Sequence, residues 1–185
     1  MGNFEKLCEI FRKSNENFLS RELNLILSWV SERSLCWKLS FYLNDKIKKS
    51  EFNKYHVDVE YNRNYGWNIK TIIDSKEKVL NITCDIIVHS RWENKNQDNL
   101  IAIEMKKSTW KEDEKQKDKD RLIALTKKLN DWVWTYWWWD FPKHVCWYIL
   151  WIYYEIDIEN KKLILELYKE WVLWKTIKSG LEINN

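Results

Sequence analysis

The hydrophobic pattern changes its period along the chain, and the order of these changes limits the possible folds. Apolar residues recur at helical spacing up to residue 49. Alternating and β-branched runs predict strands at 56–62, 67–73, 79–88, 100–106, 144–156 and 163–168. Residues 109–131 return to helical spacing, and the last two runs predict a hairpin. This order predicts an α/β fold with a central mixed β-sheet flanked by helices.

The chain of 185 residues has the length of one domain with its own core. No repeat, proline-rich linker or low-complexity stretch divides it. We therefore expect a single domain over 1–185, with N-terminal helices at 1–49 and a C-terminal hairpin at 143–175. Ser31 is a candidate N-cap for the second helix, which places Glu32 in the first turn of that helix.

Composition and charge exclude several classes of protein. The longest apolar run, 145–154, is too short to cross a bilayer, and the first residues lack a signal-peptide pattern. The 4 cysteines form no CxxC pair, so a zinc ribbon is not expected and the thiols should stay reduced. A net charge of +3 is too small to indicate nucleic-acid binding by itself. We expect a cytoplasmic protein that makes no membrane contact.

Glycine and tryptophan are present in unusual numbers. Average usage predicts roughly 13 glycines, whereas the chain has 3, together with 14 tryptophans. Many of these tryptophans occupy places that suit glycine, such as polar loops, turns and tightly packed strands: Trp92, Trp137, Trp138, Trp139, Trp147, Trp151 and Trp171. One hypothesis is that they are glycines encoded by UGA, a codon that some bacterial lineages read as glycine and others as tryptophan. The alternative is a truly tryptophan-rich protein that stacks nucleobases.

Two neighbouring strand patterns carry polar residues in a specific arrangement. Asp85 lies on the run 79–88, and Glu104 and Lys106 share one face of the run 100–106. Charged groups on strands made of core residues are costly to bury without a purpose. If the two strands pair, two carboxylates and a lysine meet in one site that suits a hard cation such as Mg²⁺. The alternative is a surface ion pair on an edge strand.

These residues resemble the motif of a known nuclease superfamily. Asp85, the string Glu104-Met105-Lys106 and the upstream Glu32 are similar to the PD-(D/E)xK, or restriction-endonuclease-like, pattern. The fuller strings at 31–34, 58–63 and 85–89 resemble a bacterial branch of it. The resemblance covers about 31–155, which would be the catalytic core, and Cys84 stands where the motif's name has proline.

The resemblance implies Mg²⁺- or Mn²⁺-dependent hydrolysis of phosphodiester bonds, with DNA as the expected substrate. Asp85, Glu104 and Glu32 would be metal ligands, with Glu32 in an accessory role, and Lys106 would orient the attacking water. Asp58 and Glu60 are expected to share a strand face, and the alternatives are that one of them reaches the metal or that the face is solvated. Candidate phosphate contacts are Arg63, Lys70, Lys107 and Arg121.

Two further readings remain open. One is a nuclease fold retained for binding or assembly without turnover, and the other is a binder of single-stranded nucleic acid that stacks bases on its tryptophans. The sequence leaves open the form of the nucleic acid, its sequence specificity and the pathway. It also leaves open whether the chain forms a homodimer or uses a partner protein.

Overall fold

The computed structural model describes residues 2–63, 71–73, 79–81, 83–94, 96–109, 113, 115–116, 119, 147–170 and 172–181. Its two helices are α1 (Asn3–Leu27) and α2 (Glu32–Lys48). Its strands are β1 (His56–Val59), β2 (Thr71–Ile73), β3 (Val79–Asn81), β4 (Ile86–His89), β5 (Asn99–Lys107), β6 (Leu150–Asp157), β7 (Lys162–Lys169) and β8 (Val172–Gly180). Among the described residues, no helix is long and apolar enough to cross a membrane.

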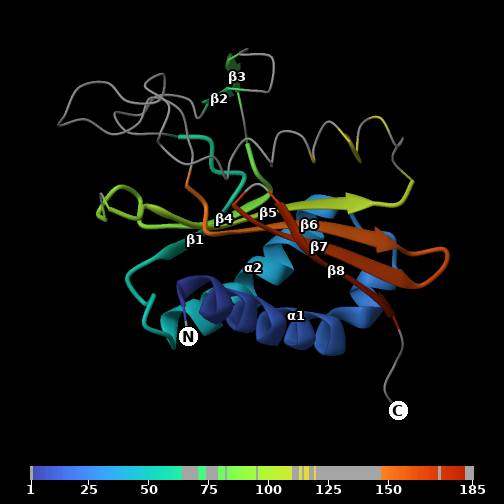
Figure 1. Cartoon of the computed structure of the whole chain (residues 1–185). Coiled ribbons are helices and arrows are strands. Elements are labelled where there is room, and N and C mark those ends of the chain that lie inside the picture. Colours follow the sequence, from blue (N-terminus) through green and yellow to red (C-terminus); the bar gives the residue numbers. More distant parts are fainter. Residues whose placement is uncertain are drawn as a thin grey trace.

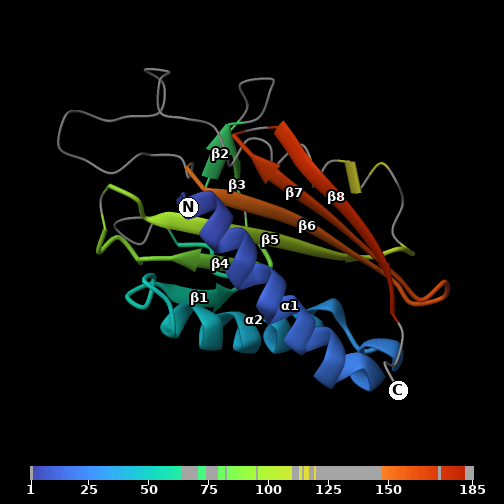
Figure 2. The same ribbon diagram turned by 60° about the horizontal axis from the view of Figure 1, so that its bottom comes forward.

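Six of the strands form one mixed sheet in the order β1-β4-β5-β6-β7-β8, and β2 and β3 form a separate pair. β5 and β6 run parallel, whereas every other neighbouring pair in the sheet is antiparallel. Helices α1 and α2 lie against one face of the sheet, as Figures 1 and 2 show. The prediction of an α/β fold with a mixed sheet is therefore confirmed.

The main core lies between the two helices and this sheet face. Strand β5 is buried from Asn99 to Met105, as expected for a central strand. Its residues Ile101, Ile103 and Met105 pack in the same cluster as Leu35 of α2. Because side chains alternate along a strand, Glu104 and Lys106 project from the opposite face, away from the helices.

Two predicted strand boundaries need correction. The run 79–88 is two strands rather than one: β3 pairs with β2, and β4 begins only at Ile86 and pairs with β1 and β5. Polar Asn81 and exposed Thr83 lie at this interruption, where continued burial of the strand would be costly. The C-terminal hairpin gains a third strand, β8, which pairs antiparallel with β7. Of the predicted helix 109–131, the described residues 113, 115, 116 and 119 are helical.

Three tryptophans adopt a backbone conformation that favours glycine. The φ angles of Trp29, Trp92 and Trp147 are 62°, 69° and 68°, a region that costs an L-residue roughly 1–2 kcal/mol. Trp29 directly follows Ser28, the C-cap of α1, at the position where glycine most often ends a helix. By contrast, Trp151 is fully buried in β6 with its ring centroid 4.2 Å from that of Tyr168.

The backbone thus separates the tryptophans into two groups. Trp29, Trp92 and Trp147 support the glycine hypothesis. Trp151 gives opposing observations: its ring packs against Tyr168, whereas its buried indole N–H has no hydrogen-bond partner among the described residues. Trp137, Trp138, Trp139 and Trp171 lie outside the described residues.

Candidate active site

Asp85 and Glu104 lie beside each other where β4 meets β5. The antiparallel register pairs Ile86 with Ile103, so the next position outward brings Asp85 opposite Glu104. The Oδ2 atom of Asp85 accepts a hydrogen bond of 2.7 Å from the backbone N–H of Met105. The Asp85 carboxylate therefore continues the ladder of hydrogen bonds along β5 at the point where β4 begins.

Lys106 completes the cluster that the strand pairing predicts. Its Nζ atom lies 3.3 Å from Oε1 of Glu104, and the side chains are only 13% and 11% exposed. The structure thus brings Asp85, Glu104 and Lys106 together.

The surroundings of Asp85 make its ionised form costly. Burial is the main reason why the pKa of Asp85 is raised, and the carboxylates of Glu32 and Glu60 raise it further. The Met105 N–H and the Lys106 ammonium act in the opposite direction. A half-buried carboxylate among other carboxylates favours binding of a cation, since a cation repays the cost of holding the charges there.

Glu32 joins the helical layer to the end of β5. It is the first residue of α2, where Ser31 caps the helix by accepting a hydrogen bond from the Ser34 N–H, as predicted. Its Oε1 atom accepts a hydrogen bond of 3.0 Å from the backbone N–H of Lys107, the residue after Lys106. The Glu32 carboxylate is therefore held at the edge of the cluster, although it lies far from Asp85 in the sequence.

The side chains of Asp58 and Glu60 bind different partners and do not share one strand face as expected. Glu60 directly follows β1 with a φ of 52°, and its carboxylate binds the guanidinium of Arg33 at 2.7 Å. Its backbone N–H donates to the carbonyl oxygen of Asp85 at 3.0 Å. Asp58 is held away from Asp85 by other groups, so of these two carboxylates only Glu60 lies beside the cluster.

His89 of β4 and Arg91, two residues after it, form a compact network with Asp58 of β1. Asp58 binds Nε2 of the fully buried His89 at 2.9 Å and receives two hydrogen bonds from Arg91, of 2.9 and 2.6 Å. Burial of Asp58 raises its pKa, but the hydrogen bonds from His89 and Arg91 outweigh this effect and lower it well below its ordinary range. His89 therefore has the structural partner that a buried histidine needs.

The four residues predicted to contact phosphate differ in their surroundings. Lys107 Nζ donates to the carbonyl oxygen of Val30 at 2.5 Å and so ties the connection between α1 and α2 to β5. Arg63 is exposed, and Lys70 and Arg121 lie outside the described residues.

Sequence reasoning missed a second set of charged residues on the same sheet face. Glu155 of β6 binds Lys115 at 2.7 Å, and Glu166 of β7 binds Lys119 at 2.8 Å. The signal was present as polar residues at alternate positions of apolar strands, the same pattern that revealed Glu104 and Lys106.

The donors fit a hard cation in kind and number. Mg²⁺ is usually held by one or two carboxylates and keeps several waters, so Asp85 and Glu104 suffice. Within the part of the chain that the structure describes, no three histidine, cysteine, aspartate or glutamate side chains are already gathered around a metal position. Binding would therefore need the Glu104 carboxylate to turn from Lys106 toward Asp85.

No protein-family model, no curated protein and no solved structure matches this chain.

Proposed function

We propose that the chain hydrolyses phosphodiester bonds of nucleic acid, with DNA as the expected substrate, in an arrangement like that of the restriction-endonuclease-like nucleases. The observation that supports this most directly is Asp85 opposite Glu104, with Lys106 3.3 Å from Glu104. A mixed sheet with helices α1 and α2 on one face is consistent with such a fold.

In this proposal Asp85 and Glu104 would hold Mg²⁺ or Mn²⁺, and Glu32 of α2 would support them from beside the end of β5. The bound cation supplies positive charge that offsets the charge developing on the phosphate. Lys106 positions the attacking water through a hydrogen bond from Nζ. Hydrolysis joins the water oxygen to phosphorus, breaks the bond to one sugar oxygen and leaves a proton on that oxygen.

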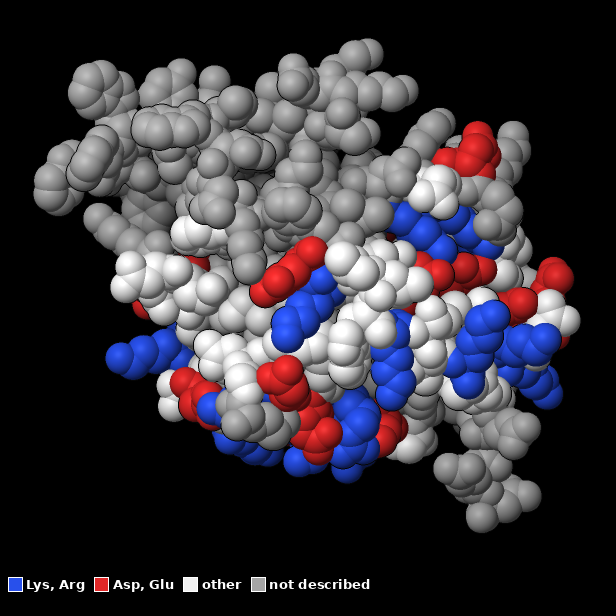
Figure 3. Space-filling view, viewed as in Figure 1, with Lys and Arg blue, Asp and Glu red and all other residues white. Residues whose placement is uncertain are grey.

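The surface charge suggests how strongly the substrate is held. Acidic and basic side chains are interspersed on the face seen in Figure 3, and the net charge is only +3. So small a net positive charge is expected to give few phosphate contacts and modest affinity for nucleic acid. A second copy or a partner protein that adds affinity fits this balance.

One observation favours a second candidate, a single-strand binder without turnover. Trp37 and Phe41 lie one helical turn apart on α2 and are 61% and 69% exposed. They line a cavity of about 780 Å³ together with Lys38 and Arg91. Aromatic rings beside cationic groups are typical of sites that stack bases.

Cleavage distinguishes the two candidates. Labelled single-stranded DNA, duplex DNA and RNA of one sequence are incubated with the protein in Mg²⁺, Mn²⁺ or chelator. The nuclease proposal predicts shortened products that require the metal. Binding without any cleavage, weakened by Trp37→Ala and Phe41→Ala, favours the second candidate.

A further inference from the structure

The polar face of the sheet continues beyond the candidate active site onto β6 and β7. The parallel register places Glu155 of β6 beside Lys106, and Tyr153 beside Glu104. The next pairing places Glu166 of β7 beside Tyr153. The charged positions thus follow one another across three neighbouring strands, from β5 to β7.

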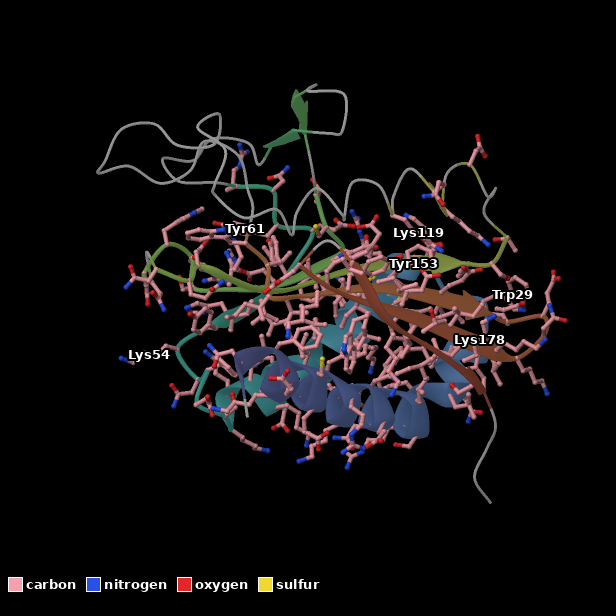
Figure 4. The ribbon with its side chains drawn as sticks, viewed as in Figure 1. Trp29, Lys54, Tyr61, Lys119, Tyr153 and Lys178 are labelled. Atoms are coloured by element: carbon pink, nitrogen blue, oxygen red, sulfur yellow. The ribbon has the colours of Figure 1, made fainter. Side chains whose placement is uncertain are left out.

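The segment after β5 supplies two lysines to this face. Lys115 and Lys119 are four residues apart and both helical, so their side chains project from the same side of the segment. Figure 4 shows Lys119 together with Tyr153 above the sheet, on the side away from α1 and α2. Each lysine therefore reaches the face that carries Glu104 and Lys106.

The two lysines differ in exposure. Lys115 is 6% exposed, and its partner Glu155 is also contacted by the Tyr153 hydroxyl at 3.3 Å. Lys119 is 22% exposed, and its Nζ atom lies 4.5 Å from the centre of the Tyr153 ring as well as 2.8 Å from Glu166. An ammonium group has three donors, so Lys119 can keep Glu166 and still donate to a further oxygen on its open side.

We propose that Lys119 binds a phosphate of the substrate backbone next to the scissile one. Lys115 neutralises the charge of Glu155, so that the nucleic-acid strand is not repelled as it crosses β6. The proposal rests on the proposed nuclease function. It implies that the nucleic-acid strand crosses the sheet from β5 toward β7. Without the two lysines, Glu155 and Glu166 would extend the negative charge of Asp85 and Glu104 and repel phosphate.

The different roles of the lysines predict opposite results for two matched double variants. If Lys119 contacts phosphate directly, then Lys119→Gln weakens binding, and adding Glu166→Gln does not restore it. If Lys115 acts by neutralising Glu155, then Lys115→Gln weakens binding, and adding Glu155→Gln restores it. Each double variant removes a whole ion pair, which avoids a buried charge without a partner.

The test measures binding of fluorescent single-stranded and duplex oligonucleotides of one sequence across a salt series, with Ca²⁺ replacing Mg²⁺. We expect Lys119→Gln to raise Kd several-fold and to reduce the slope of log affinity against log salt by about 0.7 for single strands or 0.9 for duplex. Lys13→Gln, on α1, is the control and should leave both values unchanged. A melting curve for each variant confirms that it folds.

The outcomes separate this inference from the proposed function. Wild-type affinity and salt slope in Lys119→Gln/Glu166→Gln overturn the role of Lys119, even if the wild type cleaves nucleic acid. Weak binding by Lys115→Gln/Glu155→Gln overturns the role of Lys115. Binding that depends on Lys119, in a protein that never cleaves, overturns the nuclease function alone. A wild type that neither binds nor cleaves overturns both.

Discussion

The carboxylate of Asp85 accepts a 2.7 Å hydrogen bond from the backbone N–H of Met105, the residue between Glu104 and Lys106. The acid that precedes β4 is thereby fixed to β5 at the position of the other two site residues. Because the contact is to the backbone, it does not depend on the rotamer of either partner on β5. This hydrogen bond fixes the Asp85 carboxylate where it can bind a cation. Without a cation, the ionised form of Asp85 is unfavourable there, because the pKa of Asp85 is raised.

Replacing Asp85 with asparagine should abolish cleavage and stabilise the fold. The amide oxygen can still accept a hydrogen bond from the Met105 N–H, but the half-buried negative charge is removed. Since the pKa of Asp85 is raised on folding, its ionised form costs stability at pH values above that pKa, and asparagine removes this cost. In chelator at neutral pH, we expect the melting temperature to rise by roughly 2–4 °C, the shift that about 1 kcal/mol gives at this size.

Added metal should make the wild type melt at a higher temperature than Asp85→Asn, the reverse of the order in chelator. Mn²⁺ or Mg²⁺ should raise the melting temperature of the wild type, because a ligand stabilises the state that binds it, and should not raise that of Asp85→Asn. Asp45→Asn, which changes an exposed carboxylate of α2, is the matched control and should respond to metal like the wild type. An equal response of Asp85→Asn to metal would place the cation elsewhere.

Two substitutions of Glu32 should separate its two roles. Glu32→Gln keeps an acceptor for the Lys107 N–H, whereas Glu32→Ala removes it. If the carboxylate also helps to hold the metal, Glu32→Gln folds like the wild type but needs more Mg²⁺ to reach half of its maximal cleavage rate. An unchanged Mg²⁺ dependence in Glu32→Gln, with loss of stability in Glu32→Ala, would show a purely structural role.

The Asp58 network predicts a defined loss of stability in acid. The pKa of Asp58 is lowered on folding, so its contribution is fully present above the ordinary aspartate pKa and is lost as the pH falls through the lower, folded value. Asp58→Asn should lower the free energy of unfolding by about 2 kcal/mol at neutral pH, since bonds to charged groups are lost. Urea unfolding at several pH values should show this difference shrinking below about pH 4. A difference independent of pH would contradict the assignment.

The glycine hypothesis predicts opposite effects of one substitution at two sites. Trp29→Gly should stabilise the fold by about 1 kcal/mol, because the φ of 62° then carries no steric cost. Trp37→Gly, in the interior of α2, should destabilise it by about 1 kcal/mol, since glycine is a poor helix former. Urea unfolding measures both values. UGG codons at positions 29, 92 and 147 would contradict the hypothesis.

The fold was largely predictable because hydrophobic periodicity reports which face of each element is buried. It separated the helical layer from the strands and placed Glu104 and Lys106 on one face of β5. The break between β3 and β4 was not predictable, because a change of partner strand depends on contacts distant in the sequence. Strand β8 was missed because its residues are largely exposed and show no clear alternation.

The candidate site was partly predictable for the same reason. Pairing of neighbouring strands brought Asp85 to Glu104, as alternation indicated. Asp58 and Glu60 separate because Glu60 has a positive φ. No sequence pattern predicts a positive φ at a residue other than glycine. The pairs Lys115–Glu155 and Lys119–Glu166 join segments that only the folded sheet brings together.

The most direct test of the proposed nuclease mechanism is the single-turnover rate of DNA cleavage as a function of Mg²⁺ concentration for wild type, Asp85→Ala and Lys106→Ala. This mechanism requires a wild-type rate that saturates with Mg²⁺ and is absent in chelator, and no cleavage by Asp85→Ala. Lys106→Ala should saturate at a similar Mg²⁺ concentration with a rate about 10²–10⁴-fold lower, because it lacks the group that positions water. A wild-type rate in Lys106→Ala, or no cleavage by the wild type at any Mg²⁺ concentration, would contradict it.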